Sequence, residues 1–164
     1  MHEVYLGLGS NLDDRLDNLQ RAIDELDKIG QVVSRSKIFE TEPWGEENQP
    51  KFLNTCVKFE TEIAPEDLLE SVKAIEKSLG REDSYRWGPR LIDIDILFYD
   101  QEVVNSQRLT IPHPGLAQRA FVLVPLTQIG ARIIHPTLGQ TVEQLLAAVD
   151  SRGVVESSQQ WQIT

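Results

Sequence analysis

The stretch from Arg86 to Leu97, RWGPRLIDIDIL, holds the residues whose types and spacing are best suited to chemistry. In a β-strand, side chains two residues apart share a face, so Asp93 and Asp95 would point the same way, roughly 6.6 to 6.8 Å apart along the strand. Two carboxylates at this distance repel each other by roughly 2 to 3 kcal/mol at an effective dielectric constant of about 20. A bound cation removes that repulsion, so the pattern predicts a metal-binding pair. The alternating residues would face the core: Ile92, Ile94 and Ile96.

The residues before the two aspartates indicate that the ligand is a polyphosphate. Pro89 fixes its own φ and biases Gly88 toward extended geometry, so Arg90 projects from a defined turn. The planar guanidinium group matches phosphate oxygens, and carboxylate oxygens suit Mg²⁺, which is often shared with phosphates. A pair of such ions, roughly 3.5 to 4 Å apart, fits within the span of the two carboxylates. The alternative is a solvated strand face, which is the usual explanation of an arbitrary D-x-D pattern.

Composition narrows the class of protein. A chain of 164 residues is expected to form one domain, residues 1–164. Its formal net charge of −10 argues against a general nucleic-acid surface. The single Cys56 cannot form an internal disulfide and favours a reduced compartment. Neither a signal peptide nor a long apolar run is apparent, so we expect a cytoplasmic protein without a membrane partner.

The predicted elements alternate in type along the chain. A strand from Glu3 to Leu8 precedes an amphipathic helix with apolar residues from Leu16 to Ile29, for which Gly30 is a good C′ residue. The remaining main elements are extended from Gln31 to Thr41, a strand from Phe52 to Glu62, a helix from Pro65 to Gly80, and a strand from Leu91 to Tyr99.

This order predicts an α+β, ferredoxin-like fold, in which an antiparallel sheet carries both main helices on one face. Two further helices are expected over Leu116 to Ile129 and from Thr141 to Val149, where Thr141 and Gln144 match a capping box.

The sequence Gly7 to Asn11, GLGSN, has two interpretations. A dinucleotide-binding fingerprint is disfavoured because Leu12 occupies the place of the third glycine. We expect the glycines to allow a tight strand-to-helix turn, with Ser10 or Asn11 as the helix cap. The functional alternative is that this turn flanks a pocket at one end of the sheet.

Several single residues also have two interpretations each. Trp44 either packs on the core or covers a ligand, and Asn54 is either structural or binds a heterocycle. Glu76 and Lys73 are expected to form an ordinary surface pair. His113 is held between two prolines near basic residues, whereas His135 is interpreted as a plain turn residue.

With these residues in view, the chain resembles the 6-hydroxymethyl-7,8-dihydropterin pyrophosphokinase family of the folate pathway. Members of this family pass the pyrophosphoryl group of ATP to a pterin alcohol and release AMP. The resemblance covers nearly the whole chain, and the RWGPR and DIDIL motifs are its most specific part. The shared motifs are GLGSN at Gly7, TEPWG at Thr41, FLN at Phe52, GR at Gly80, RWGPRLIDIDIL at Arg86, LTIPHP at Leu109 and RAFVLVPL at Arg119.

The resemblance implies mobile active-site loops, ATP as co-substrate and two Mg²⁺ ions held by Asp93 and Asp95. The catalytic residues that it implies are Arg81, Arg90, Asp93 and Asp95. The residues that it places on the ATP side are Lys73, Glu76, Arg81, Trp87, Arg90, Ile96, Arg108, Leu109, Thr110, His113 and Arg119. The residues that it places around the pterin are Thr41, Glu42, Pro43, Trp44, Phe52, Asn54, Trp87 and Phe121.

The chain departs from the family pattern at three positions. Phe52 stands where members often carry tyrosine, which preserves stacking but removes a hydroxyl group. Asp83 stands where a second basic residue is frequent, and its carboxylate should repel the phosphates of ATP. Relatives can carry an uncharged polar residue at Lys73, and Arg86 has no assigned role.

Two rival hypotheses stay open on the sequence. The first is a different Mg-nucleotide transferase, because aspartates and arginines specify a polyphosphate but not its acceptor. The second is a non-catalytic module, either a ligand sensor or an RNA-binding sheet, although the negative charge and the absence of an aromatic stripe disfavour RNA. The expected partners are small molecules, and the expected state is a monomer.

Overall fold

The structure is a computed structural model that describes residues 1–41, 50–80 and 91–162. Eight residues of interest lie outside these ranges: Glu42, Pro43, Trp44, Arg81, Asp83, Arg86, Trp87 and Arg90. Among the helices described, none is long and apolar enough to cross a membrane.

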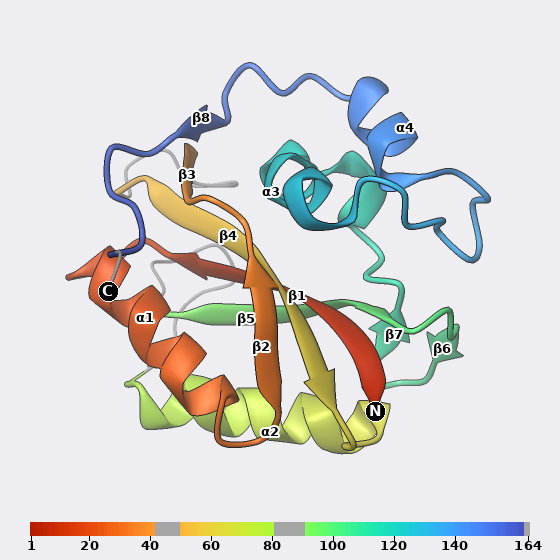
Figure 1. Ribbon diagram of the computed structural model, residues 1–164, viewed down its shortest axis with the longest axis horizontal. Helices are drawn as coiled ribbons and strands as arrows, with labels where there is room; N and C mark the ends of the chain where they lie inside the picture. The colour runs from red at the N-terminus through yellow and green to blue at the C-terminus, as the bar shows by residue number, and fades with distance from the viewer. Residues whose placement is uncertain (42–49, 81–90, 163–164) are drawn as a thin grey trace.

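A six-stranded antiparallel sheet forms the centre of the molecule (Figure 1). Its order is β5-β1-β4-β3-β8, and β2 pairs with β4 beside β3. The expected extended segment from Gln31 to Thr41 thus forms two short strands, which both pair with β4. The strand bounds are β1 His2–Ser10, β2 Gln31–Arg35, β3 Phe39–Thr41, β4 Phe52–Thr61, β5 Asp93–Tyr99 and β8 Val155–Glu156. This order confirms the ferredoxin-like prediction.

Helices cover both faces of the sheet. The helices α1 (Arg15–Leu26) and α2 (Pro65–Ser78) pack on one face, as predicted, around buried β1 residues such as Leu6. The helices α3 (Ala120–Gly130) and α4 (Val142–Ala147) cover the other face through a second cluster that includes Cys56. Because both faces are covered, both sets of alternating side chains in β4 include buried apolar residues, such as Val57 on one face and Cys56 on the other, so its sequence pattern does not alternate cleanly.

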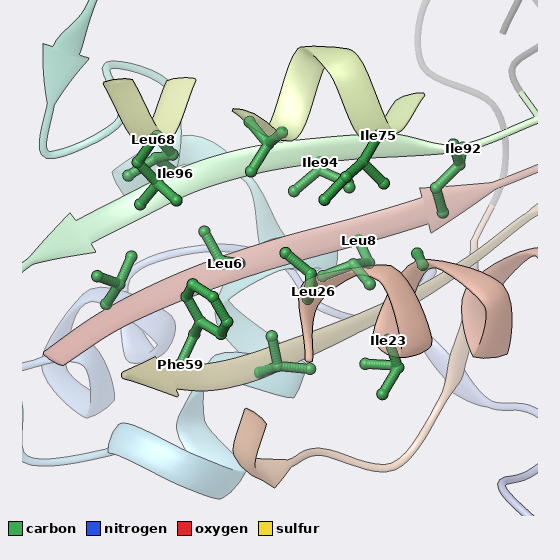
Figure 2. Close-up of a cluster of buried hydrophobic side chains, with 14 of the residues drawn as sticks. Leu6, Leu8, Ile23, Leu26, Phe59, Leu68, Ile75, Ile92, Ile94 and Ile96 are labelled. Carbon is green, nitrogen blue, oxygen red and sulfur yellow. The ribbon is translucent and has the colours of Figure 1, made fainter. Parts of the chain in front are cut away.

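The strand β5 separates its side chains as the sequence predicts. Ile94 and Ile96 point into the cluster between the sheet and α2, where Leu68 and Ile75 also lie (Figure 2). Asp93 and Asp95 alternate with them and are half-buried. The β1–β5 register shifts between Tyr5 and Leu6, so the alternation ends beyond Ile96, and Leu97 and Phe98 both join the second cluster.

The glycine predictions near α1 are wrong. Gly7 and Gly9 lie inside β1, and the side chain of Asp14, rather than Ser10 or Asn11, caps α1 by accepting from the Asp17 N–H at 3.1 Å. Gly30 is not a helix cap, because α1 ends at Leu26. A Cβ atom there would lie 2.5 Å from a ring carbon of Phe59, so the close approach to β4 requires glycine.

The region from Leu116 to Ile129 also differs from the single predicted helix. It divides into a 3₁₀ turn (Leu116–Gln118) and α3, because Arg119 between them is extended and serves as the N-cap. The capping box of Thr141 and Gln144 is confirmed. Two short strands, β6 (Val104–Asn105) and β7 (Thr110–Ile111), form a separate hairpin.

His135 is more than a plain turn residue. The residue is 7% exposed, and its Nδ1 accepts from the backbone N–H groups of Thr137 (3.2 Å) and Leu138 (3.1 Å). Burial lowers its pKa, which favours the neutral ring that these two contacts need. The buried imidazole of His135 therefore stabilises the turn that includes Thr137 and Leu138.

Candidate functional site

Three strands bring the predicted site residues into register on the α3 face of the sheet. Asn54 of β4 and Asp93 of β5 lie on either side of Gly9 of β1. In the next row of that face, Cys56 and Asp95 lie on either side of Gly7. Because residues directly opposite in an antiparallel pair share a face, the amide and the carboxylates project from the same side of the sheet.

Gly9 avoids crowding the side chain of Asn54, whereas the Leu97 side chain lies against Gly7. A Cβ atom on Gly9 would lie 3.0 Å from the Asn54 Oδ1 and 3.6 Å from the Phe52 Cδ1. Glycine inside a strand marks a place where a ligand or another chain approaches closely. The expected tight turn is thus a strand, and the alternative that this segment flanks a pocket stays a prediction.

Asp93 and Asp95 have the chemistry of a magnesium site. They are half-buried on one face of one strand, and the side chain of Asp95 is 43% exposed. Mg²⁺ prefers hard oxygen ligands, keeps several waters and commonly binds one or two carboxylates together with substrate phosphates. The residues present thus fit a divalent metal at this edge of the sheet.

His113 lies next to the carboxylate pair and is held as a neutral ring. Its Nε2 is 4.0 Å from the Asp95 Oδ1, and its Nδ1 accepts from the Gly115 N–H at 3.1 Å. Because Nδ1 is an acceptor, the proton of the neutral ring belongs on Nε2. Burial and then the nearby positive charge of Arg119 lower the pKa of His113 to about 4. His113 therefore offers an N–H donor beside Asp95 at neutral pH.

The start of α3 adds a cation and an aromatic ring to this group. Arg119 is the N-cap of α3, and its guanidinium carbon lies 5.8 Å from the centre of the Phe121 ring. Phe121 is partly buried against the second apolar cluster. Arg119, where the predicted helix is interrupted, thus lies near two other predicted site residues, His113 and Phe121.

Asn54 is fixed in orientation by its neighbour on β3. Asn54 and Thr41 are 7% and 6% exposed, and the Asn54 Nδ2 donates to the Thr41 Oγ1 at 2.7 Å. Phe52, two residues earlier on the same face of β4, is partly exposed. An amide held in this way can present its remaining polar edge to a flat heterocycle.

Glu76 does not form the expected surface pair with Lys73. It is 4% exposed, whereas Lys73 is exposed. The Glu76 Oε2 accepts from the backbone N–H of Ile94 at 2.8 Å. A carboxylate from α2 therefore binds β5 at the residue between the two aspartates. The sequence pattern placed Glu76 at the edge of the apolar stripe but gave no sign of this backbone partner.

The other residues predicted on the ATP side lie in two settings. Ile96 and Leu109 have side chains in the first apolar cluster. Arg108 is exposed, and its Nη1 donates to the Glu70 Oε1 at 3.0 Å. Thr110 is exposed on β7. A nucleotide role for these residues stays a prediction.

Comparison with known proteins decides the family. A model of the family "7,8-dihydro-6-hydroxymethylpterin-pyrophosphokinase (HPPK)" matches residues 5–131. The chain belongs to this family. It is similar to the 2-amino-4-hydroxy-6-hydroxymethyldihydropteridine pyrophosphokinase of Aquifex aeolicus, with 44% identity over 83% of this chain and 85% of that protein. The protein of the same name from Methylorubrum extorquens is 44% identical over 94% of this chain and 98% of its own length.

The pyrophosphokinase family also accounts for the fold. The crystal structure of Plasmodium falciparum HPPK-DHPS wild type with SDX-DHP aligns with 90% of this chain at a TM-score of 0.72 and 18% identity. This chain spans 43% of that larger protein, which supports the shared fold alone.

Family membership fixes the class of reaction. The chain is an ATP-dependent pyrophosphokinase of folate biosynthesis, which transfers the pyrophosphoryl group of ATP to the hydroxymethyl group of 6-hydroxymethyl-7,8-dihydropterin and releases AMP.

The pyrophosphokinase should keep His113 neutral in mildly acidic solution. Because its pKa is lowered from 6.5 to about 4, the unfolded chain binds this proton first, and His113 contributes stability that is lost as the pH falls below about 6.5. A titration of the imidazole nitrogens by NMR in the absence of ATP should show a neutral ring at pH 5.5. Arg119→Gln should raise the pKa by removing a repulsive charge, and an ordinary pKa in the unsubstituted enzyme would contradict this environment.

Glu76 should stabilise β5 through the oxygen that accepts from the Ile94 N–H. Glu76→Ala leaves the buried Ile94 N–H without this acceptor and should lower the free energy of unfolding by roughly 1 to 3 kcal/mol. Glu76→Gln keeps an acceptor oxygen and should lose less. Urea unfolding of both variants measures the difference, and equal stability of the two would show that the bond to Ile94 contributes nothing.

Proposed function

We propose that pyrophosphoryl transfer takes place on the α3 face of the sheet, between Asn54 and the pair Asp93 and Asp95. The observation that carries this proposal is the register that aligns Asn54, Gly9 and Asp93 across three strands. It puts a hydrogen-bonding amide for a heterocycle and carboxylates for a metal on one surface, with only a glycine between them.

The pterin binds at the β3–β4 side of this face. Its ring stacks between Phe52 and Phe121, and its amide edge bonds to Asn54, whose orientation Thr41 fixes. The family resemblance adds contacts from residues outside the described ranges: Glu42, Pro43, Trp44 and Trp87.

The nucleotide binds at the β5 side. His113 donates its Nε2–H to a phosphate oxygen, and Arg119 places a positive charge on the triphosphate. Asp93 and Asp95 hold two Mg²⁺ ions, which when bound neutralise the triphosphate and lower the pKa of the alcohol. The remaining residues assigned to ATP are Lys73, Glu76, Ile96, Arg108, Leu109 and Thr110 within the described chain, and Arg81, Trp87 and Arg90 outside it.

The chain accelerates the reaction mainly by positioning and electrostatics. The alcohol oxygen of the pterin forms a bond to the β-phosphorus as the bond from that phosphorus to the α,β-bridging oxygen breaks, and AMP leaves with the electron pair. The alcohol proton is lost to solvent. Phe52, Phe121 and Asn54 orient the acceptor, while Arg81, Arg90 and Arg119 stabilise charge on the phosphates, so no covalent enzyme intermediate is required.

We also propose that residues 1–164 act as one domain and as a monomer in the cytoplasm. The buried, unpaired Cys56 fits a reducing compartment, and the net charge of −10 disfavours nucleic acid as a partner.

Asp95→Ala should lower kcat by at least about 100-fold while changing the Kd of the pterin by less than about threefold, because the carboxylate serves the metal and phosphate side. Nucleotide and pterin products are separated by chromatography after incubation with ATP, Mg²⁺ and hydroxymethyldihydropterin.

The matched control for Asp95 is Glu102→Ala, which removes an exposed carboxylate beyond the far end of β5 and should leave kcat unchanged. Near-normal turnover by the Asp95 variant would contradict the metal assignment. Release of ADP in place of AMP by the unsubstituted enzyme would instead indicate ordinary phosphoryl transfer to another acceptor.

A further inference from the structure

Arg15, at the start of α1, joins segments that flank the pterin side of the sheet. Its Nη1 lies 2.9 Å from the Glu40 Oε2 on β3 and donates to the Lys51 carbonyl oxygen, just before β4, at 2.8 Å. Its Nη2 donates to the Gln159 Oε1 near the C-terminus at 3.2 Å. One guanidinium group thus links β3, the start of β4 and the end of the chain.

The segment Ser157–Trp161, called here the C-terminal clasp, binds the backbone that leads into β3. The Gln160 side chain makes two bonds to Ile38, with Oε1 accepting from its N–H and Nε2 donating to its carbonyl oxygen, both at 2.8 Å. The Ser157 N–H donates to the same carbonyl oxygen at 2.9 Å. After β8 the chain passes beside β3 and descends to the start of α1 (Figure 1).

A second set of contacts fastens the end of the clasp. The Trp161 Nε1 donates to the Ser36 carbonyl oxygen at 2.9 Å, and the guanidinium carbon of Arg35 lies 4.6 Å from the centre of the Trp161 ring. The clasp therefore holds every residue from Arg35 to Ile38 except Lys37 by a direct contact. Lys37 itself is paired with Glu156 of β8, Nζ to Oε1 at 3.0 Å.

The strand β3 needs this support because it is short. It has three residues, and its outer neighbour β8 has two. A strand of this length contributes few ladder bonds, so side-chain contacts decide how firmly it is held. Its last residue, Thr41, fixes the amide of Asn54. A change that displaces β3 would therefore also disturb the orientation of the Asn54 amide.

We propose that Arg15 and Gln160 are positioning residues for the pterin, acting through β3 on Thr41 and Asn54. The inference rests on the proposed function, which assigns Asn54 to the pterin. None of the bonds described above reaches β5, His113 or Arg119. Loss of the clasp therefore weakens binding of the pterin and leaves binding of ATP unchanged.

The test measures the kinetics of full-length Gln160→Ala and Arg15→Met. Each loses two or three hydrogen bonds, so KM for the pterin should rise about tenfold while KM for ATP and kcat at saturation stay within about twofold. Gln160→Glu keeps the acceptor for the Ile38 N–H and should recover part of the loss. The matched controls are Gln101→Ala, which removes an exposed amide bonded to the Ile134 carbonyl, and Arg152→Met, which removes an exposed arginine paired with Asp150.

Calorimetry of pterin binding without ATP gives a second readout, with a Kd about tenfold weaker expected for Gln160→Ala and for Arg15→Met. An unchanged Kd and KM in both variants would overturn the inference. A parallel rise in KM for both substrates, with a lower melting temperature, would also overturn it, because it would show a general loss of structure. If the unsubstituted enzyme forms no AMP and no diphosphorylated pterin, it is the proposed function that fails.

Discussion

The antiparallel pairing of β1 between β4 and β5 is the constraint on which the site depends. It fixes which residues lie opposite each other, so Asn54 and Asp93 flank Gly9 on one surface. A side chain at Gly9 would crowd Asn54, and a one-residue slip would turn both aspartates into the core. The buried Ile94 and Ile96 prevent that slip, since it would expose them. Core packing and site geometry are therefore set by the same ladder.

Side-chain contacts outside the strand pairing also hold the strands that carry the site residues. At β5, Glu76 binds the backbone between the two aspartates, and His113 stays neutral beside Asp95. At the other side of the sheet, Arg15 and the C-terminal clasp hold β3. In the proposed site, the two substrates need different contacts. The chain has a net charge of −10, so the polyanionic ATP must bind to metal ions and local cations, whereas the pterin binds through stacking and hydrogen bonds.

The sequence predicted those features that depend on local pattern. The alternation of aspartate and isoleucine in β5, the order of the main elements and the capping box at Thr141 all follow from short-range periodicity and were confirmed. The family followed from long motifs around Arg86 to Leu97. The role of Gly9 and the partner of Glu76 could not be predicted, because both depend on which strands become neighbours. The C-terminal clasp could not be predicted for the same reason. Its polar residues look like an ordinary tail in the sequence, and their partners before β3 are more than 100 residues away.

In the proposed site, the carboxylates of Asp93 and Asp95 on β5 hold the metal ions of the pyrophosphokinase. The test is anomalous scattering from Mn²⁺ in crystals grown with a non-hydrolysable ATP analogue and the pterin. We expect two manganese peaks within coordination distance, about 2.0 to 2.3 Å, of carboxylate oxygens of Asp93 and Asp95. Peaks bound only by phosphates or by other carboxylates, with both aspartates left without metal, would contradict it.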